Sequence, residues 1–91
     1  MLWIVECGVC QQPWEAAVPA YSMPGRSIVV PVHSYLDPKT NRRMAIPCSG
    51  IGQAAIGYGP KETWERDWRR RNFGRPLPEV FDGSGLKVVA L

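Results

Sequence analysis

Two cysteines separated by two residues, Cys7 and Cys10, follow the segment 2–6 near the start of the chain, whose first four residues are apolar. A turn of this length can point both sulfur atoms at one metal ion. The chain has one further cysteine, Cys48, and a single histidine, His33. An odd number of cysteines together with one histidine suits a four-ligand metal site better than a set of disulfides. We therefore predict that Cys7, Cys10, His33 and Cys48 converge on one structural Zn²⁺ ion.

The length of the chain makes such a site useful to the fold. A chain of 91 residues buries only about 60–65% of the surface that its unfolded form exposes, so its apolar core alone is marginal. Two other uses of the cysteines stay open at this stage. They could be reduced and unliganded, with His33 at the surface, or they could serve a redox or iron–sulfur function. A thioredoxin-like cysteine pair opens a helix, whereas Pro13 follows this pair without a helical pattern.

Short strands are predicted for the first half of the chain, where β-branched and apolar residues are frequent. The predicted strands cover residues 2–6, 14–20, 27–35 and 42–46. Pro31 lies inside the third of these strands and suggests an edge or a bulge there. The polar segment 37–41 is predicted to be the turn of a hairpin that delivers Cys48.

The segments between these strands are rich in turn-forming residues. The Pro-Gly pair in 21–26 predicts a loop. The segment 49–59 is rich in glycine and is predicted to be a connector with a brief helical turn over 54–56.

The strongest helix pattern covers residues 60–74. Pro60 suits the first helical position, and Gly74 is placed to end the helix. Acidic residues come early and arginines late, as the helix dipole favours. Trp64 and Trp68 lie one turn apart, which is typical of the buried face of an amphipathic helix. The tail, 77–91, is predicted to be a hairpin or strand that turns at 82–85.

The predicted fold is therefore a single small α+β domain over residues 1–91. It contains a β-rich, zinc-binding part with a zinc knuckle and short antiparallel strands over 1–52. The basic amphipathic helix over 60–74 and the C-terminal hairpin or strand over 77–91 complete it.

The pattern of ligands resembles a group of short zinc-ribbon-like proteins from actinobacteria and their phages. In those proteins a Cys-x2-Cys pair is followed by a strand, a histidine, a loop and then a cysteine with small residues after it. The positions that match are Cys7, Cys10, His33 and the run Cys48-Ser49-Gly50, within residues 3–52. The resemblance implies a small metal-stabilised module, often encoded by a phage. It does not imply a particular partner.

Positive charge is concentrated in the predicted helix. Residues 60–75 contain six basic and three acidic residues, so this segment accounts for the whole net charge of +3. We expect Asp67 to pair with Arg71. The arginines expected to be exposed and to bind a partner are Arg66, Arg69, Arg70 and Arg75. They could form a solvated face, or bind nucleic acid through its phosphates, or bind a protein.

The sequence shows no arrangement of catalytic side chains above background, and no small-molecule substrate is evident. We therefore predict a binding module rather than an enzyme. One alternative is that it binds nucleic acid or a machine that handles nucleic acid. The other is that it is a protein-interaction factor, either a phage-encoded factor that inhibits or redirects a host protein or a minor component of the virion. No apolar stretch is long enough to span a bilayer, and residues 1–6 lack the basic start of a secretory signal. We therefore expect a cytoplasmic protein.

Overall fold

The computed structural model describes residues 2–17, 25–37 and 39–90. Eight strands and one helix follow one another along these residues. Their bounds are β1 Trp3–Glu6, β2 Pro13–Ala16, β3 Arg26–Val29, β4 Ser34–Leu36, β5 Arg43–Pro47, β6 Ile56–Pro60, α1 Lys61–Arg71, β7 Phe81–Asp82 and β8 Lys87–Ala90. One helix with several short antiparallel strands and a C-terminal strand confirms the predicted α+β class.

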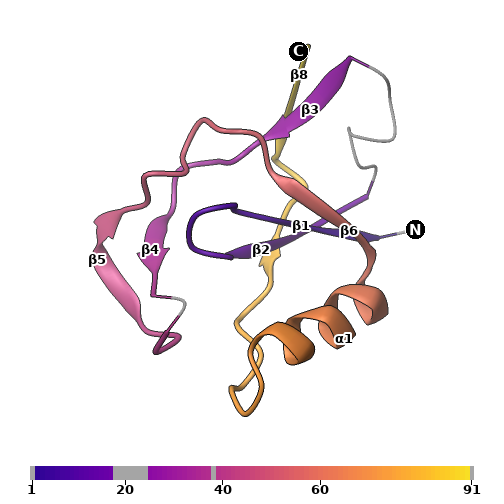
Figure 1. Ribbon diagram of the computed structural model, residues 1–91. Helices are drawn as coiled ribbons and strands as arrows, with labels where there is room; N and C mark the ends of the chain where they lie inside the picture. The colour runs from indigo at the N-terminus through magenta and orange to yellow at the C-terminus, as the bar shows by residue number, and fades with distance from the viewer. Residues whose placement is uncertain (1, 18–24, 38, 91) are drawn as a thin grey trace.

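The strands form three sheets. The largest has the order β6-β1-β2-β7, while β3 pairs with β8 and β4 pairs with β5. All neighbouring strands are antiparallel except β2 and β7, which are parallel. Figure 1 shows α1 along one side of the four-stranded sheet, and the β4–β5 hairpin and the β3–β8 pair as separate projections from it.

Strand β1 separates two apolar cores. Side chains alternate across a strand, so Ile4 packs with Trp64 and Trp68 of α1, whereas Val5 joins the core that contains the three cysteines. Both faces of β1 are therefore covered, and its last three residues are all buried. This arrangement explains why consecutive residues Trp3, Ile4 and Val5 are apolar rather than alternating with polar ones.

Helix α1 begins after Pro60, which occupies the N-cap position, and ends at Arg71. The helix is therefore shorter than the predicted segment 60–74. Asn72 is the C-cap, because its φ of −126° and ψ of 50° are not helical. Its backbone N–H still donates to the Trp68 carbonyl at 2.9 Å, and its side-chain amide donates to the same oxygen at 3.1 Å. Gly74 follows in the left-handed region with φ +83°. Trp64 and Trp68 are buried, as predicted.

The predicted strand over 27–35 is wrong as a single element. It is two strands, β3 and β4, which belong to different sheets. Pro31 has no N–H to donate to a ladder, and the chain leaves the sheet between Val30 and His33. The predicted strand over 14–20 continues only to Ala16 as β2, and its end lies outside the described residues, as does most of the predicted loop over 21–26.

The predicted helical turn over 54–56 is also wrong. Ala54 forms a bridge with Val29, and the Ala55 N–H donates to the Ile28 carbonyl at 2.8 Å. An isolated helical turn is unfavourable, because it fixes the backbone of several residues and gains only one hydrogen bond. The edge of β3 instead offers backbone hydrogen-bond partners that are already ordered. The next residues then form β6 against β1.

The C-terminal strand is present, but the hairpin that was its alternative is not. Phe81 and Asp82 pair with β2, while Lys87–Ala90 pairs with β3. The Ser84 N–H donates to the Asp82 carboxylate at 2.9 Å, which supports the bend between them. Phe81 packs edge-on against Trp14, with 6.3 Å between the ring centroids. The two strands therefore pair with strands from the first third of the chain rather than with each other.

Candidate metal centre

The turn between β1 and β2 holds the first two ligands. The Cys7 N–H donates to the Gln12 carbonyl at 3.0 Å, and the Gln11 N–H donates to the Cys7 carbonyl at 2.9 Å. These bonds close a tight turn in which Cys7 and Cys10 are both fully buried. Gln11 adopts a φ of +67°, a left-handed conformation that favours glycine. The turn therefore has knuckle geometry with an ordinary residue in the strained position.

The β4–β5 hairpin supplies the other two ligands. His33 directly precedes β4, and Cys48 directly follows β5. The Cys48 N–H donates to the His33 carbonyl at 3.1 Å, so the two ligands lie opposite each other at the open end of the hairpin. This is the arrangement predicted from the polar turn over 37–41.

The four side chains converge on one point. Their ligand atoms all lie within 4.8 Å of one another. The Sγ atoms of Cys7 and Cys48 are 3.7 Å apart, and Cys10 Sγ lies 3.2 Å from His33 Nε2. Two sulfur atoms bound to one tetrahedral ion at about 2.3 Å each would lie about 3.8 Å apart. The four residues are thus arranged to hold a single metal ion.

The orientation of His33 identifies its ligand nitrogen. His33 Nδ1 lies 2.8 Å from the Pro31 carbonyl oxygen. A carbonyl only accepts, so Nδ1 carries the proton and donates it. In the neutral ring, Nε2 then has its lone pair free, and this is the atom that faces Cys10. Support of a ligand histidine through its other nitrogen is the usual arrangement around protein-bound metals.

The environment of the sulfur atoms also fits a bound cation. The Gly50 N–H donates to Cys48 Sγ at 3.4 Å, and such a donor favours a thiolate. Burial, followed by the neighbouring Cys10 and Cys7 thiols, raises the pKa of Cys48 to about 12. Without a cation this thiol is therefore protonated at neutral pH, and a metal that binds must displace the proton.

The surroundings exclude solvent from the site. The three cysteines belong to the apolar core that also contains Trp14. The Trp14 ring packs edge-on against His33 at 5.0 Å between centroids, and His33 is only 8% exposed. Four protein ligands around one ion are the composition of closed, structural zinc sites.

Two residues outside the ligand set connect the hairpin to the knuckle. The Arg43 guanidinium of β5 donates to the Gln12 side-chain oxygen and, at 2.9 Å, to the Ser34 carbonyl. Gln12 is fully buried and donates to the Glu79 carbonyl at 3.2 Å. Neither residue was predicted from the sequence, because a polar residue next to a knuckle carries no pattern of its own.

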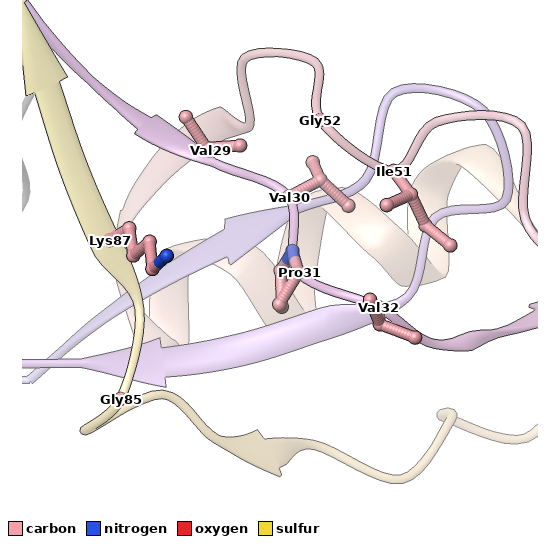
Figure 2. A pocket seen from close by; sticks show the side chains of 8 residues that line it. All are labelled: Val29, Val30, Pro31, Val32, Ile51, Gly52, Gly85 and Lys87. Carbon is pink, nitrogen blue, oxygen red and sulfur yellow. The ribbon is translucent and has the colours of Figure 1, made fainter.

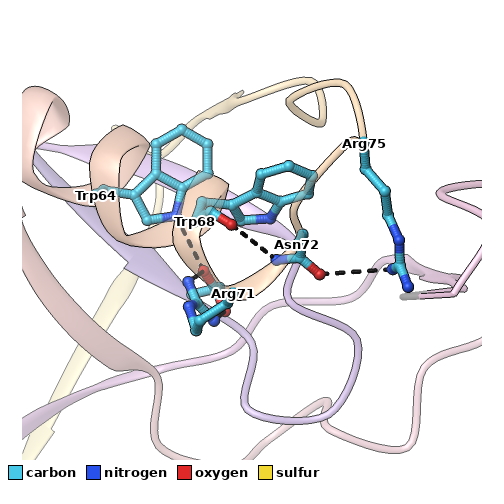
Figure 3. A network of polar contacts seen from close by, with 6 residues as sticks. Trp64, Trp68, Arg71, Asn72 and Arg75 are labelled. Carbon is cyan, nitrogen blue, oxygen red and sulfur yellow. Dashed lines mark hydrogen bonds and ion pairs between the residues drawn. The ribbon is translucent and has the colours of Figure 1, made fainter.

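The predicted partner-binding arginines are in different environments. Arg66, Arg69 and Arg70 are exposed. Arg75 is partly buried, with its guanidinium 3.5 Å from the Asn72 side-chain oxygen, so its prediction as a freely exposed residue is wrong. Figure 3 shows Arg75 directed toward Asn72 beyond the end of the helix. The Arg75 backbone N–H also donates to the Asn72 carbonyl at 3.0 Å, so Arg75 contacts Asn72 through both its backbone and its side chain.

A buried carboxylate anchors α1 to β1, and it too was missed. Glu6 is 1% exposed, and it accepts from Trp64 Nε1 at 2.9 Å and from Arg71 at 3.2 and 3.3 Å. Arg71 therefore pairs with Glu6, not with Asp67 as predicted. Its guanidinium also lies over the Tyr58 ring at 4.9 Å. Burial, and then the charge of Glu6, raise the pKa of Tyr58. The sequence feature that could have predicted this buried carboxylate is the position of Glu6 at the end of an otherwise apolar strand.

Among the residues that the structure describes, no helix combines the length and the apolar character needed to cross a membrane. Comparison of the chain with protein-family models, with curated protein sequences and with solved structures yields no match. The metal centre therefore has to be interpreted from its own geometry.

Proposed function

We propose that the chain is a non-catalytic binding module whose fold is stabilised by one Zn²⁺ ion. The convergence of three thiols and one imidazole supports this proposal. Thiolate and imidazole are the ligands that zinc prefers in structural sites. Ligand atoms within 4.8 Å of one another enclose the space of one ion, which is too small for an iron–sulfur cluster.

Elemental analysis of the purified protein tests the zinc assignment. We expect about one zinc per chain and no visible absorption, with zinc lost in the Cys48→Ser variant. Stoichiometric iron with a coloured sample would identify the iron–sulfur alternative instead. A metal-free protein with an unchanged fold would show that the thiols are unliganded.

We further propose that the module docks on nucleic acid, or on a machine that handles it, through α1. The observation that supports this proposal is the exposure of Arg66, Arg69 and Arg70. Trp64 and Trp68, on the same helix, are instead buried in the core between α1 and the sheet. Clustered arginines neutralise phosphates and release counterions. The rest of the chain is neutral in formal charge, so a polyanion would be attracted to this helix.

The salt dependence of binding tests this docking. Affinity for nucleic acid should fall steeply as salt rises, and each of Arg66→Gln, Arg69→Gln and Arg70→Gln should reduce the slope by about 1. Arg26→Gln is the matched control, since Arg26 is also exposed but lies on β3. Equal effects of the control and the helix variants would contradict a docking site on α1.

A second candidate function is that of a protein-interaction factor, such as the phage-encoded regulators that the sequence resemblance suggests. The observation that favours it is an apolar pocket of about 340 Å³ lined by residues 29–32, 51–52, Gly85 and Lys87. Figure 2 shows Val29, Val32 and Ile51 around this pocket, and Val32 is 85% exposed. A host protein retained at high salt, and released by Val32→Asp, would favour this function over docking on nucleic acid.

A further inference from the structure

Phe73 is an aromatic side chain that the folded chain leaves almost wholly in water. It is 95% exposed, although two other aromatic residues of the same segment, Trp64 and Trp68, are buried. It follows α1 by two residues. The Asn72 N–H still donates to the Trp68 carbonyl in the helical manner. The Phe73 side chain therefore projects from the turn that directly follows the helix.

The turn that carries Phe73 is well supported by hydrogen bonds. Asn72 is 8% exposed, and its side-chain amide donates to the Trp68 carbonyl at 3.1 Å. The Arg75 N–H donates to the Asn72 carbonyl at 3.0 Å. Figure 3 shows Asn72 between Trp68 and Arg75 at this turn. The exposed ring is therefore attached to an ordered piece of backbone.

Phe73 follows the exposed arginines closely in the sequence, three residues after Arg70. Arg66 and Arg70 are four residues apart and share a face of α1, and Arg69 is adjacent to them. All three are exposed, and Arg69 and Arg70 belong to the last helical turn, which Phe73 follows. Three exposed arginines on the helix are thus followed, directly after its C-cap, by an exposed aromatic residue.

We propose that this surface binds single-stranded nucleic acid, with phosphates along Arg66, Arg69 and Arg70 and one base stacked on Phe73. This inference rests on the proposed docking of nucleic acid on α1 and specifies its form. A duplex stacks its bases on one another and offers no free face to an aromatic ring. A single strand does offer one, and proteins that bind it combine a cationic track with aromatic stacking.

The charge of the surface favours a nucleic-acid strand over an apolar protein partner. Aromatic residues in protein interfaces lie at the centre of a patch that becomes dry on binding. Asn72 separates Phe73 from three consecutive arginines, 69–71; Arg71 pairs with Glu6, whereas Arg69 and Arg70 are exposed on the helix surface. A polyanion with exposed bases satisfies both the charges and the ring.

The test compares a single-stranded oligothymidylate with a duplex of equal length, using the full zinc-loaded chain. Phe73→Ala should weaken binding of the single strand by about 5- to 150-fold, the range that corresponds to one stacked base, and should leave duplex binding unchanged. Phe73→Trp should retain binding, and the emission of the new indole should be quenched by the single strand. Met44→Ala is the matched control, because Met44 is a partly exposed apolar residue of β5.

The outcomes separate this inference from the proposed function. Equal affinity for the two forms, with no effect of Phe73→Ala, would overturn base stacking while leaving the arginine docking intact. Failure of both forms to bind at low salt would overturn the docking itself. Loss of a bound host protein in Phe73→Ala, with nucleic-acid binding unchanged, would assign Phe73 to a protein interface and overturn the inference.

Discussion

At the scale of single residues, the metal centre depends on backbone positions that are not ligands. Pro31 supplies the carbonyl that orients His33, and Gly50 supplies an N–H to the Cys48 sulfur. Gln11 closes the knuckle in a left-handed conformation. Each of these positions can be altered without removing a ligand. Variants there therefore test the backbone geometry of the site while its four ligands are retained.

Gly50→Ala should weaken metal binding. A Cβ atom on Gly50 would lie 2.5 Å from Cys7 Sγ and 3.1 Å from Cγ2 of Val9, so the knuckle and the loop after Cys48 would have to separate. Because residues that support metal ligands typically contribute 10- to 100-fold, we expect zinc affinity, measured by competition with a chelator, to fall by about 10-fold or more. Gly85→Ala is the control, since a Cβ there meets nothing within 4 Å. Equal affinities of the two variants would refute the close approach.

Gln11→Gly should stabilise the folded protein. A left-handed conformation costs an ordinary residue about 1–2 kcal/mol, and part of this gain is lost to the greater freedom of glycine in the unfolded chain. We expect a net stabilisation of about 0.5–1 kcal/mol, measured by denaturant unfolding of the zinc-loaded protein. Gln11→Ala removes the side chain but retains the conformational cost, so it should not stabilise. A gain in both variants would show that the side chain, not the backbone, matters.

At the scale of elements, β1 organises the molecule because it pairs with β2 and β6 and is covered on both faces. One face carries Val5 toward the core that contains the cysteines, and the other carries Ile4 and Glu6 toward α1. The helix that presents the exposed arginines is thus attached to the same strand that leads into the knuckle. Damage to the contact between α1 and β1 should affect stability without changing the ligands.

Arg71→Ala should destabilise the protein through Glu6. The carboxylate would remain buried with Trp64 as its remaining side-chain donor, and breaking a buried pair from one side costs about 3–5 kcal/mol. The Arg71 side chain is 34% exposed, so we expect about 2 kcal/mol, because solvent weakens the pair. Thermal unfolding should show this as a lower Tm, by about 4–8 °C per kcal/mol. Arg66→Ala, in the same helix but exposed, should change Tm little; similar losses in both variants would contradict the anchoring role.

At the scale of the whole molecule, the metal centre joins segments that are far apart in the sequence. The knuckle belongs to the four-stranded sheet, whereas His33 and Cys48 flank a separate two-stranded hairpin. The cysteines are also members of the larger apolar core. Without a bound ion, the hairpin would be attached to the knuckle by fewer contacts, such as those of Arg43 with Gln12.

Removal of the metal should therefore unfold the chain rather than one loop. Binding of zinc contributes about 10–16 kcal/mol in small structural sites, which exceeds the stability expected of a core of this size. We expect a chelator to abolish the far-ultraviolet circular dichroism of the folded state, and added zinc to restore it. A thermal melt that is unchanged in chelator would contradict the coupling of metal binding to folding.

Local signals in the sequence were sufficient for several parts of this structure. Thiol and imidazole side chains are few in the chain, and only one combination of them makes a four-ligand site, so the ligand set followed from residue chemistry. The helix and the hairpin turn over 37–41 depend on contacts between near neighbours in the chain. Such contacts leave a periodic or compositional pattern, and the burial of Trp64 and Trp68 followed from it.

Long-range pairing was decided only in three dimensions. The segment 27–35 divides between two sheets, and Ala54 forms a bridge with β3. The strands β7 and β8 pair with β2 and β3, respectively, rather than with each other. The partner of Arg71 is Glu6, which lies 65 positions away along the chain, because folding brings β1 beneath the helix. A sequence states which residues can pair, but the choice among distant partners depends on which surfaces the packed core leaves adjacent.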